Sequence, residues 1–249
     1  MNQLHWYAPG RVWSIDYTEL FYPVDERHRW CLAIRDLTTH RQLLALPADH
    51  ASAEIAFHGL NALFKQHTPP LVLKADNGSH FTAHKVQQLL QNHHVTPLFS
   101  PPYTPTYNGS IEAGIGSLKN LLFQNTLYHG RCDRPTSADL EAARLQLNAR
   151  PLNPFGDTRS PDQLWRDRTP ITETERKIFL GALDKYRYEL QCDHEAAHSD
   201  IFNPPPTNTP TNKNRDFPTN AERIAVRQAL VALGYLVIQK ARFSPPVVA

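Results

Sequence analysis

Three acidic residues occupy related places at the borders of apolar segments, and they restrict how the chain can fold. Asp16 and Asp76 end apolar, strand-like runs, whereas Glu112 opens a segment with helical periodicity. Thirty-five residues separate Asp76 from Glu112. Carboxylates that converge in one cleft repel each other unless a cation neutralises them. The arrangement therefore predicts a metal site.

The chemistry of these side chains indicates which metal they would bind. Carboxylate oxygens are hard ligands of the kind that Mg²⁺ and Mn²⁺ prefer. Two such ions about 3.5–4 Å apart can hold the attacking and leaving oxygens of an in-line phosphoryl displacement. We therefore predict that Asp16, Asp76 and Glu112 bind two ions of Mg²⁺ or Mn²⁺ in one active site.

Each acid also has an ordinary structural explanation. Asp16 can be a strand-edge residue bonded to a turn amide, and Asp76 can form a turn before Asn-Gly. Glu112 can be a first-turn residue that the helix dipole favours. It is the combination of the three contexts that favours the metal site.

The pattern of apolar residues predicts an α/β fold with a mixed central sheet flanked by helices. Strand-forming runs are expected at 12–20, 29–37, 42–48, 71–76 and 95–99. Helices are expected after Asp49 and after Thr82, each as a cap, and over 110–127. Three successive strands followed by alternating helices and strands indicate a sheet with both parallel and antiparallel pairs.

The segments around the acids resemble the catalytic core of retroviral-type integrases and the related bacterial insertion-sequence transposases. The resemblance rests on Asp-Asn-Gly-Ser at 76–79, Ser-Pro-Pro-Tyr-Thr-Pro at 100–105, Tyr-Asn-Gly at 107–109, Asn-Ala-Arg-Pro at 148–151 and Arg-Ser-Pro-Asp-Gln-Leu at 159–164. The family's Asp, Asp, Glu triad, with 35 residues between the last two acids, matches Asp16, Asp76 and Glu112. His80 stands where the family often has a Glu, and Gly116 stands where it often has a basic residue.

This resemblance implies a ribonuclease H-like fold and a function as a DNA transposase or integrase. Such an enzyme is a two-metal polynucleotidyl transferase, which cuts a phosphodiester bond and joins the new 3′-hydroxyl to a target strand. Two alternatives stay open. One is a truncated, non-enzymatic relic or interaction protein, and the other is a ribonuclease H-like nuclease without strand transfer.

The resemblance also implies partners and DNA contacts. The partners are DNA, both element ends and target, and further copies of the chain, because two ends must be joined. Either a separately encoded helix-turn-helix protein reads the ends, or the chain is a truncated copy. The residues predicted to contact DNA are Lys119, Tyr107, Asn108 and Asn77. Lys119 lies seven residues after Glu112, so the two align within roughly 20° on one helix edge.

Composition adds boundaries and exclusions. We expect a catalytic core at 1–168, a helical extension at 169–199, a linker rich in Pro, Asn and Thr at 200–219, and a small helix–strand segment at 220–249. A net charge of +2 is too small to indicate nucleic-acid binding by itself. The three cysteines lack metal-ligand spacing, which favours reduced thiols and a cytoplasmic protein. No run of about 18 apolar residues predicts a membrane span.

Overall fold

The computed structural model describes residues 2–101, 109–131, 133–151, 158–198 and 216–240. The chain divides into two compact units. We call Pro9–Arg176 the sheet unit, and Met1–Ala8 with Lys177–Ala249 the terminal unit. Within the described ranges, no helix combines the length and the apolar character needed to cross a membrane.

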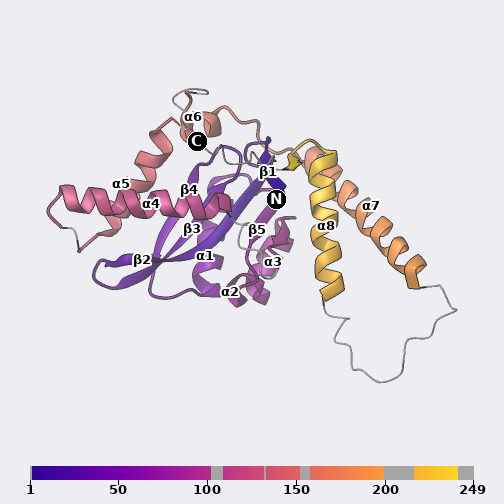
Figure 1. The fold of residues 1–249 in the computed structure, drawn as a ribbon, viewed down its shortest axis with the longest axis horizontal. Coiled ribbons are helices and arrows are strands. Elements are labelled where there is room, and N and C mark those ends of the chain that lie inside the picture. Colours follow the sequence, from indigo (N-terminus) through magenta and orange to yellow (C-terminus); the bar gives the residue numbers. More distant parts are fainter. Residues whose placement is uncertain (1, 102–108, 132, 152–157, 199–215, 241–249) are drawn as a thin grey trace, which may run out of the picture. The chain divides into compact units, whose positions relative to one another are not determined.

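A five-stranded sheet forms the centre of the sheet unit (Figure 1). Its strands are β2 (Val12–Val24), β3 (His28–Asp36), β4 (Gln42–Ala48), β5 (Val72–Ala75) and β6 (Thr96–Phe99). The strand order is β4-β3-β2-β5-β6, with β2, β3 and β4 antiparallel and β5 and β6 parallel to β2. The mixed sheet predicted from the sequence is therefore confirmed.

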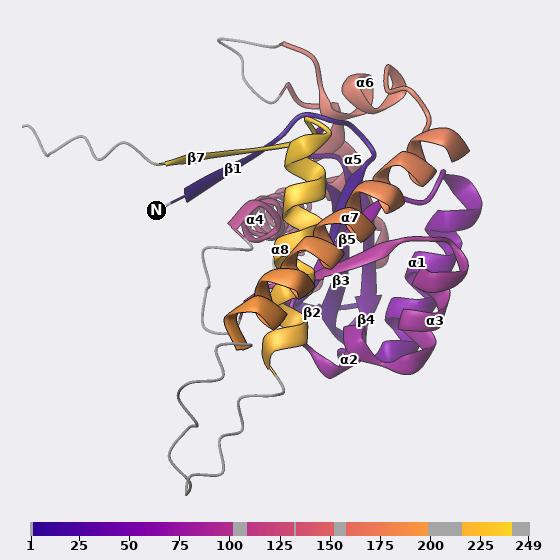
Figure 2. The ribbon, with the colours of Figure 1, turned by 90° about the vertical axis from the view of Figure 1, so that its right-hand side faces the viewer.

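Helices cover both faces of this sheet, because alternate strand residues point to opposite sides. Figure 2 shows α1 (Ala53–Gln66) and α3 (His84–Asn92) on one side and α4 (Gly109–Tyr128) on the other. On β3, Leu32 and Ile34 belong to the same apolar cluster as α1 and α3, whereas Cys31 belongs to that of α4 and of α5 (Ser137–Ala149). The described residues also form α2 (Ser79–Thr82), α6 (Pro161–Arg166) and α7 (Glu173–His198).

Two of the predicted helix caps are wrong. Ser52, not Asp49, caps α1 by accepting from the backbone N–H of Ile55. Asp49 instead forms ion pairs with Arg27 and His28. Thr82 ends α2 and caps nothing; its hydroxyl donates to the carbonyl of Gly78.

The start of α5 follows the sequence, because a complete capping box is present there. The side chain of Thr136 accepts from the backbone N–H of Asp139, and the Asp139 carboxylate accepts from the backbone N–H of Thr136.

The terminal unit contains most of α7, α8 (Asp216–Ala232) and a two-stranded antiparallel sheet. That sheet pairs β1 (Asn2–Trp6) with β7 (Leu236–Lys240). The sequence predicts a strand near β7 but no strand at β1. Of the linker expected at 200–219, residues 216–219 lie in α8 and the others lie outside the described residues.

Candidate active site

The parallel pairing of β2 and β5 brings the first two acids together. Val12 pairs with Val72, Trp13 with Leu73 and Ser14 with Lys74. These pairs end two residues before Asp16 on β2, and Asp76 directly follows β5, so both acids lie just beyond the paired segment. The negative charge of Asp76 raises the pKa of Asp16, which places the two carboxyl groups near each other.

Packing of the first turn of α4 positions the third acid. Ile111 and Ile115 form a buried cluster with Ala33 of β3. Ala33 is the cross-strand partner of Asp16. Glu112 follows Ile111 directly and is exposed, as its helical position predicts. The turn that carries Glu112 is therefore held against the strand position opposite Asp16.

A buried arginine fixes this turn, and the sequence analysis did not identify it. Nη1 of Arg35 donates to the carbonyl oxygen of Ser110 at 2.5 Å, and its Nε donates to the carbonyl oxygen of His40 at 3.0 Å. Burial lowers the pKa of the Arg35 guanidinium to about 10, so it stays charged at neutral pH. Gly114 makes room, because a Cβ there would lie 2.3 Å from Nη1 of Arg35.

The electrostatics of Asp16 show that it shares its surroundings with the other two acids. The pKa of Asp16 is raised to about 6, first by burial and then by the negative charges of Asp76 and Glu112, while a hydrogen bond from the Tyr17 amide opposes the shift. The backbone N–H of Tyr17 donates to Oδ1 of Asp16 at 2.8 Å. A site that disfavours the ionised form of an acid through burial and like charge is one in which a cation is favourable.

Lys74 supplies a positive charge at the same place, and it too was missed from the sequence. Its side chain is almost fully buried on β5. Burial lowers the pKa of Lys74 to about 7, while the charges of Glu112 and Asp16 act in the opposite direction. The available signal was a lysine inside the apolar run 71–75, because a lysine is rarely buried unless it is paired.

The loop after β5 is held by its own turn. Oδ1 of Asp76 accepts from the backbone N–H of Gly78 at 2.8 Å, which is the turn contact that the ordinary explanation of this acid requires. Nε2 of His80 lies 3.9 Å from the same oxygen. Burial lowers the pKa of His80, and the charge of Asp76 opposes this effect. His80 is therefore neutral near pH 7.

The donor set fits a divalent cation in chemical type. Three carboxylates offer only oxygen donors, which suits Mg²⁺ or Mn²⁺. Among the described residues, however, no group of three or more His, Cys, Asp or Glu side chains is close enough together to form a metal site. The two-ion site and the roles of Asp16, Asp76 and Glu112 stay predictions.

The structure places only some of the predicted DNA contacts. Lys119 lies on α4 and is partly exposed, with Nζ 5.3 Å from the centre of the Phe21 ring. Nδ2 of Asn77 donates to the carbonyl oxygen of Ser100 at 2.7 Å, which ties the loop after β5 to the end of β6. Tyr107 and Asn108 lie outside the described residues.

The mixed sheet, the helices on both of its faces, and the acids on β2 and directly after β5 define a class of α/β domain with an acidic region beside two inner strands of the sheet. Residues 7–105 match the sequence profile of the integrase core domain. This span includes Asp16 and Asp76 and ends before Glu112. The match supports a function in DNA integration or transposition. A comparison with curated proteins gave no match.

Solved structures with a similar fold include the catalytic core domain of BIV integrase, at 22% sequence identity and a TM-score of 0.50, covering 64% of this chain and 95% of that one. A chain of the simian T-cell lymphotropic virus intasome in complex with PP2A regulatory subunit B56 gamma has 21% identity and a TM-score of 0.58, covering 68% of this chain and 59% of that one. The HTLV-2 integrase catalytic core domain in complex with magnesium, in its dimeric form, has 18% identity and a TM-score of 0.52, covering 64% and 97%. These comparisons confirm the ribonuclease H-like fold and the resemblance to integrase catalytic cores.

Proposed function

We propose that this protein is a DNA transposase or integrase that cleaves a phosphodiester bond and transfers the resulting 3′ end to a target strand. The observation that carries the proposal is the parallel pairing of β2 and β5, which ends just before Asp16 and Asp76. The charge of Glu112 also acts on Asp16. These three acids come from distant parts of the chain, and in this proposal they form one active site.

In this proposal Asp16, Asp76 and Glu112 hold two divalent ions, Mg²⁺ or Mn²⁺. When bound, such ions supply Lewis acidity and lower the pKa of bound water. The chain's own residues prepare the site. Arg35 holds the turn that carries Glu112, and the Gly78 amide orients Asp76. Lys74 contributes positive charge to a site that is otherwise acidic.

The proposed partners follow from the same function. DNA is the substrate, and homo-oligomers bring two ends together. The HTLV-2 integrase core occurs in dimeric and trimeric forms, and the simian virus protein is part of an intasome. These facts concern those proteins and support the proposal by analogy only. A separately encoded helix-turn-helix protein that reads element ends is a further part of the proposal.

Metal-dependent nicking of supercoiled duplex DNA tests the proposal. Asp76→Asn keeps the shape of the side chain and removes the charge that holds a divalent ion, so it should abolish nicking while circular dichroism stays unchanged. Asp193→Asn is the matched control, because Asp193 is exposed on α7. Nicking by Asp76→Asn at the wild-type rate would show that the active site is elsewhere.

A second assay separates the proposed enzyme from a nuclease that only hydrolyses DNA. Labelled donor duplex with a free 3′-hydroxyl is incubated with unlabelled target plasmid and Mg²⁺. A transposase or integrase yields label joined covalently to the target. Nicking without any joined product would leave only the hydrolytic part of the proposal standing.

A further inference from the structure

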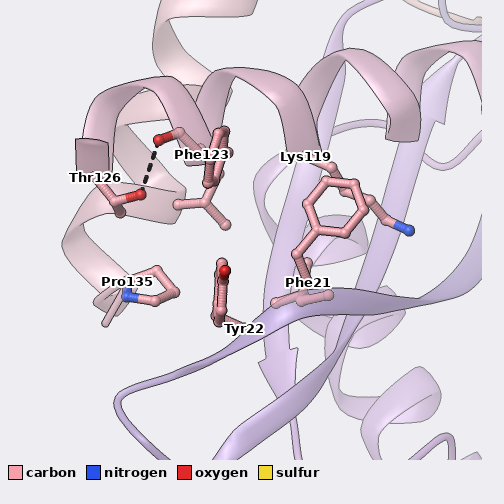
Figure 3. Close-up of a pocket in the computed structure, with 8 residues that line it drawn as sticks. Phe21, Tyr22, Lys119, Phe123, Thr126 and Pro135 are labelled. Atoms are coloured by element: carbon pink, nitrogen blue, oxygen red, sulfur yellow. Dashed lines mark hydrogen bonds between the residues drawn. The ribbon is translucent and has the colours of Figure 1, made fainter. Parts of the chain in front are cut away.

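An apolar pocket opens between β2 and α4, the same two elements that carry Asp16 and Glu112 (Figure 3). It has about 250 Å³ of space, part of it open to solvent. Because much of this space is open to solvent, the pocket is a shallow hollow, and a flat ring can rest one face against its aromatic side chains. The buried side chains of Leu20 and Leu122 line its interior.

Three aromatic side chains form the walls of the pocket and remain in contact with solvent. Phe21 is 61% exposed, Tyr22 41% and Phe123 39%. Single exposed apolar residues are ordinary, but neighbouring exposed rings around a hollow mark a binding surface.

An irregularity in β2 puts two of these rings there. Glu19 pairs with Trp30 and Val24 pairs with His28. The chain therefore advances five residues along β2 but only two along β3 between these two pairs. The extra residues form a bulge, a feature that redirects side chains and is common next to active sites. Neighbours on a regular strand point to opposite faces, yet Phe21 and Tyr22 both line the pocket beside α4 (Figure 3).

Among the described residues that line the pocket, Lys119 is the one with a positive charge. Nζ of Lys119 lies 5.3 Å from the centre of the Phe21 ring, which is a cation–π contact. In the described part of the chain, no carboxylate lines this pocket. A ligand that combines a flat ring with a negative charge therefore matches its chemistry.

The pocket also lies at a defined distance from the acids. Along α4, Lys119 is about 10 Å and Phe123 about 16 Å from Glu112 at a rise of about 1.5 Å per residue. Along β2, Phe21 is about 16 Å from Asp16 at about 3.3 Å per residue. One DNA strand rises about 3.4 Å per nucleotide, so these lengths correspond to about three to five nucleotides.

We propose that the pocket holds an unpaired nucleobase of the DNA substrate, about three to five nucleotides from the phosphate held at the acids. The inference rests on the function proposed above. Phe21, Tyr22 and Phe123 contact the base, and Lys119 binds a phosphate beside it. Because polar side chains are few in the lining, the pocket binds bases by stacking and with little preference for identity.

A second copy of this chain is the other occupant that an exposed apolar surface suggests. The lysine at the edge, without a carboxylate in the described lining, favours the nucleotide. Stacking on an aromatic side chain contributes enough to be measured, since its loss weakens binding about 5- to 150-fold per base.

The test uses the full chain and two DNA probes that differ only in their bases. Both are the same duplex with a five-nucleotide single-stranded overhang, and in one probe the overhang is abasic. We expect the wild type to bind the overhang with bases about 5- to 150-fold more tightly than the abasic overhang. Phe21→Ala and Phe123→Ala should bring this ratio close to one.

Two control variants identify the cause. Tyr128→Ala removes a ring that is 87% exposed on the same helix but outside the pocket, and should keep the wild-type ratio. Lys119→Ala should weaken both probes equally, because it removes a phosphate contact and no stacking face.

Three results would overturn the inference. The first is that the wild type nicks DNA but binds the overhang with bases and the abasic overhang equally tightly. This result would leave the proposed function intact. The second is a loss of DNA affinity in Phe123→Ala that is equal for both probes, together with a smaller mass of the variant than of the wild type in light scattering. This result would assign the surface to contact with a second copy of the chain. The third is the absence of Mg²⁺-dependent nicking by the wild type, which removes the proposed function as well.

Discussion

Two glycines on α4 differ in the space around them and allow a sharp test of how Glu112 is positioned. A Cβ at Gly114 would lie 2.3 Å from Nη1 of Arg35 and 2.6 Å from Nε2 of Gln42, whereas a Cβ at Gly116 would meet nothing within 4 Å. Both are interior helix positions of α4. The comparison of Gly114→Ala with Gly116→Ala therefore removes the shared effect of helix propensity.

The expected magnitudes follow from these contacts. Gly116→Ala should stabilise the protein by about 0.5–1 kcal/mol, because alanine loses less conformational freedom in a helix. Gly114→Ala has the same gain, but it displaces the Arg35 guanidinium from the Ser110 carbonyl. A lost hydrogen bond to a charged group costs about 1.5–3 kcal/mol, and overpacking adds about 1–3 kcal/mol. After the gain of about 0.5–1 kcal/mol is subtracted, the net effect is destabilisation by about 1.5–5.5 kcal/mol.

Urea denaturation of both variants, followed by near-UV circular dichroism, measures the difference. Gly114→Ala should also lower Mg²⁺-dependent nicking, because the turn that carries Glu112 must move, whereas Gly116→Ala should keep it. Equal stabilisation by the two substitutions would refute the claim that Arg35 occupies the space left by Gly114.

Three further predictions concern other contacts. Burial and the nearby charge of Arg35 lower the pKa of His40 to about 4 from 6.5, so protonation favours the unfolded chain and stability is lost as the pH falls from about 6.5 towards 4. Asn tolerates the observed φ of 61° at position 40. Between pH 7 and pH 5, the free energy of unfolding of His40→Asn should fall by roughly 2 kcal/mol less than that of the wild type, as measured by urea titration. An equal fall in both proteins would show that His40 does not cause the loss of stability. Arg176→Met removes hydrogen bonds to three carbonyl oxygens and should cost about 2–4 kcal/mol, whereas exposed Lys177→Met should change stability by less than about 0.5 kcal/mol; similar effects in thermal denaturation would contradict this. The isolated chain should bind DNA weakly and without sequence preference, and Lys119→Ala should reduce the slope of log K against log salt by about one; tight binding of a single sequence would reveal a recognition surface not identified here.

The order of elements in the sheet unit is predictable because the apolar residues keep a regular period. The predicted helix over 110–127 is α4, and its apolar residues at helical spacing, Ile111, Ile115, Leu118 and Leu122, are buried. The end of β2 was placed too early, because the bulge near Leu20–Pro23 breaks the alternation on which the prediction depends.

Local sequence patterns do not predict contacts between distant parts of the chain. Asp49 has the chemistry of a cap, but its ion pairs with Arg27 and His28 leave capping of α1 to Ser52. Arg176 is a charged residue in the first turn of α7, yet it is buried and donates to the carbonyl oxygens of Pro69, Pro70 and His94.

The candidate site shows the same division. The identity and spacing of the acids lie in the sequence, and so does the exposure of Glu112 beside its apolar stripe. The register between β2 and β5 cannot be read from the sequence, because the pairing of strands 60 residues apart depends on the whole sheet. Arg35 was missed for this reason as well, since its partner Ser110 is 75 residues away.

The pairing of β1 with β7 has a consequence for synthesis on the ribosome. Trp6 pairs with Leu236, so the first strand waits for 230 further residues before its partner exists. At about 5–20 residues per second, this delay is roughly 10–50 s. The sheet unit is one continuous segment of chain between them, and it can complete its core while β1 is still unpaired. Protease treatment of nascent chains stalled near residue 200 should therefore yield a resistant fragment of the sheet unit without the first strand. The two units thus have a built-in order of folding, in which the terminal unit closes last.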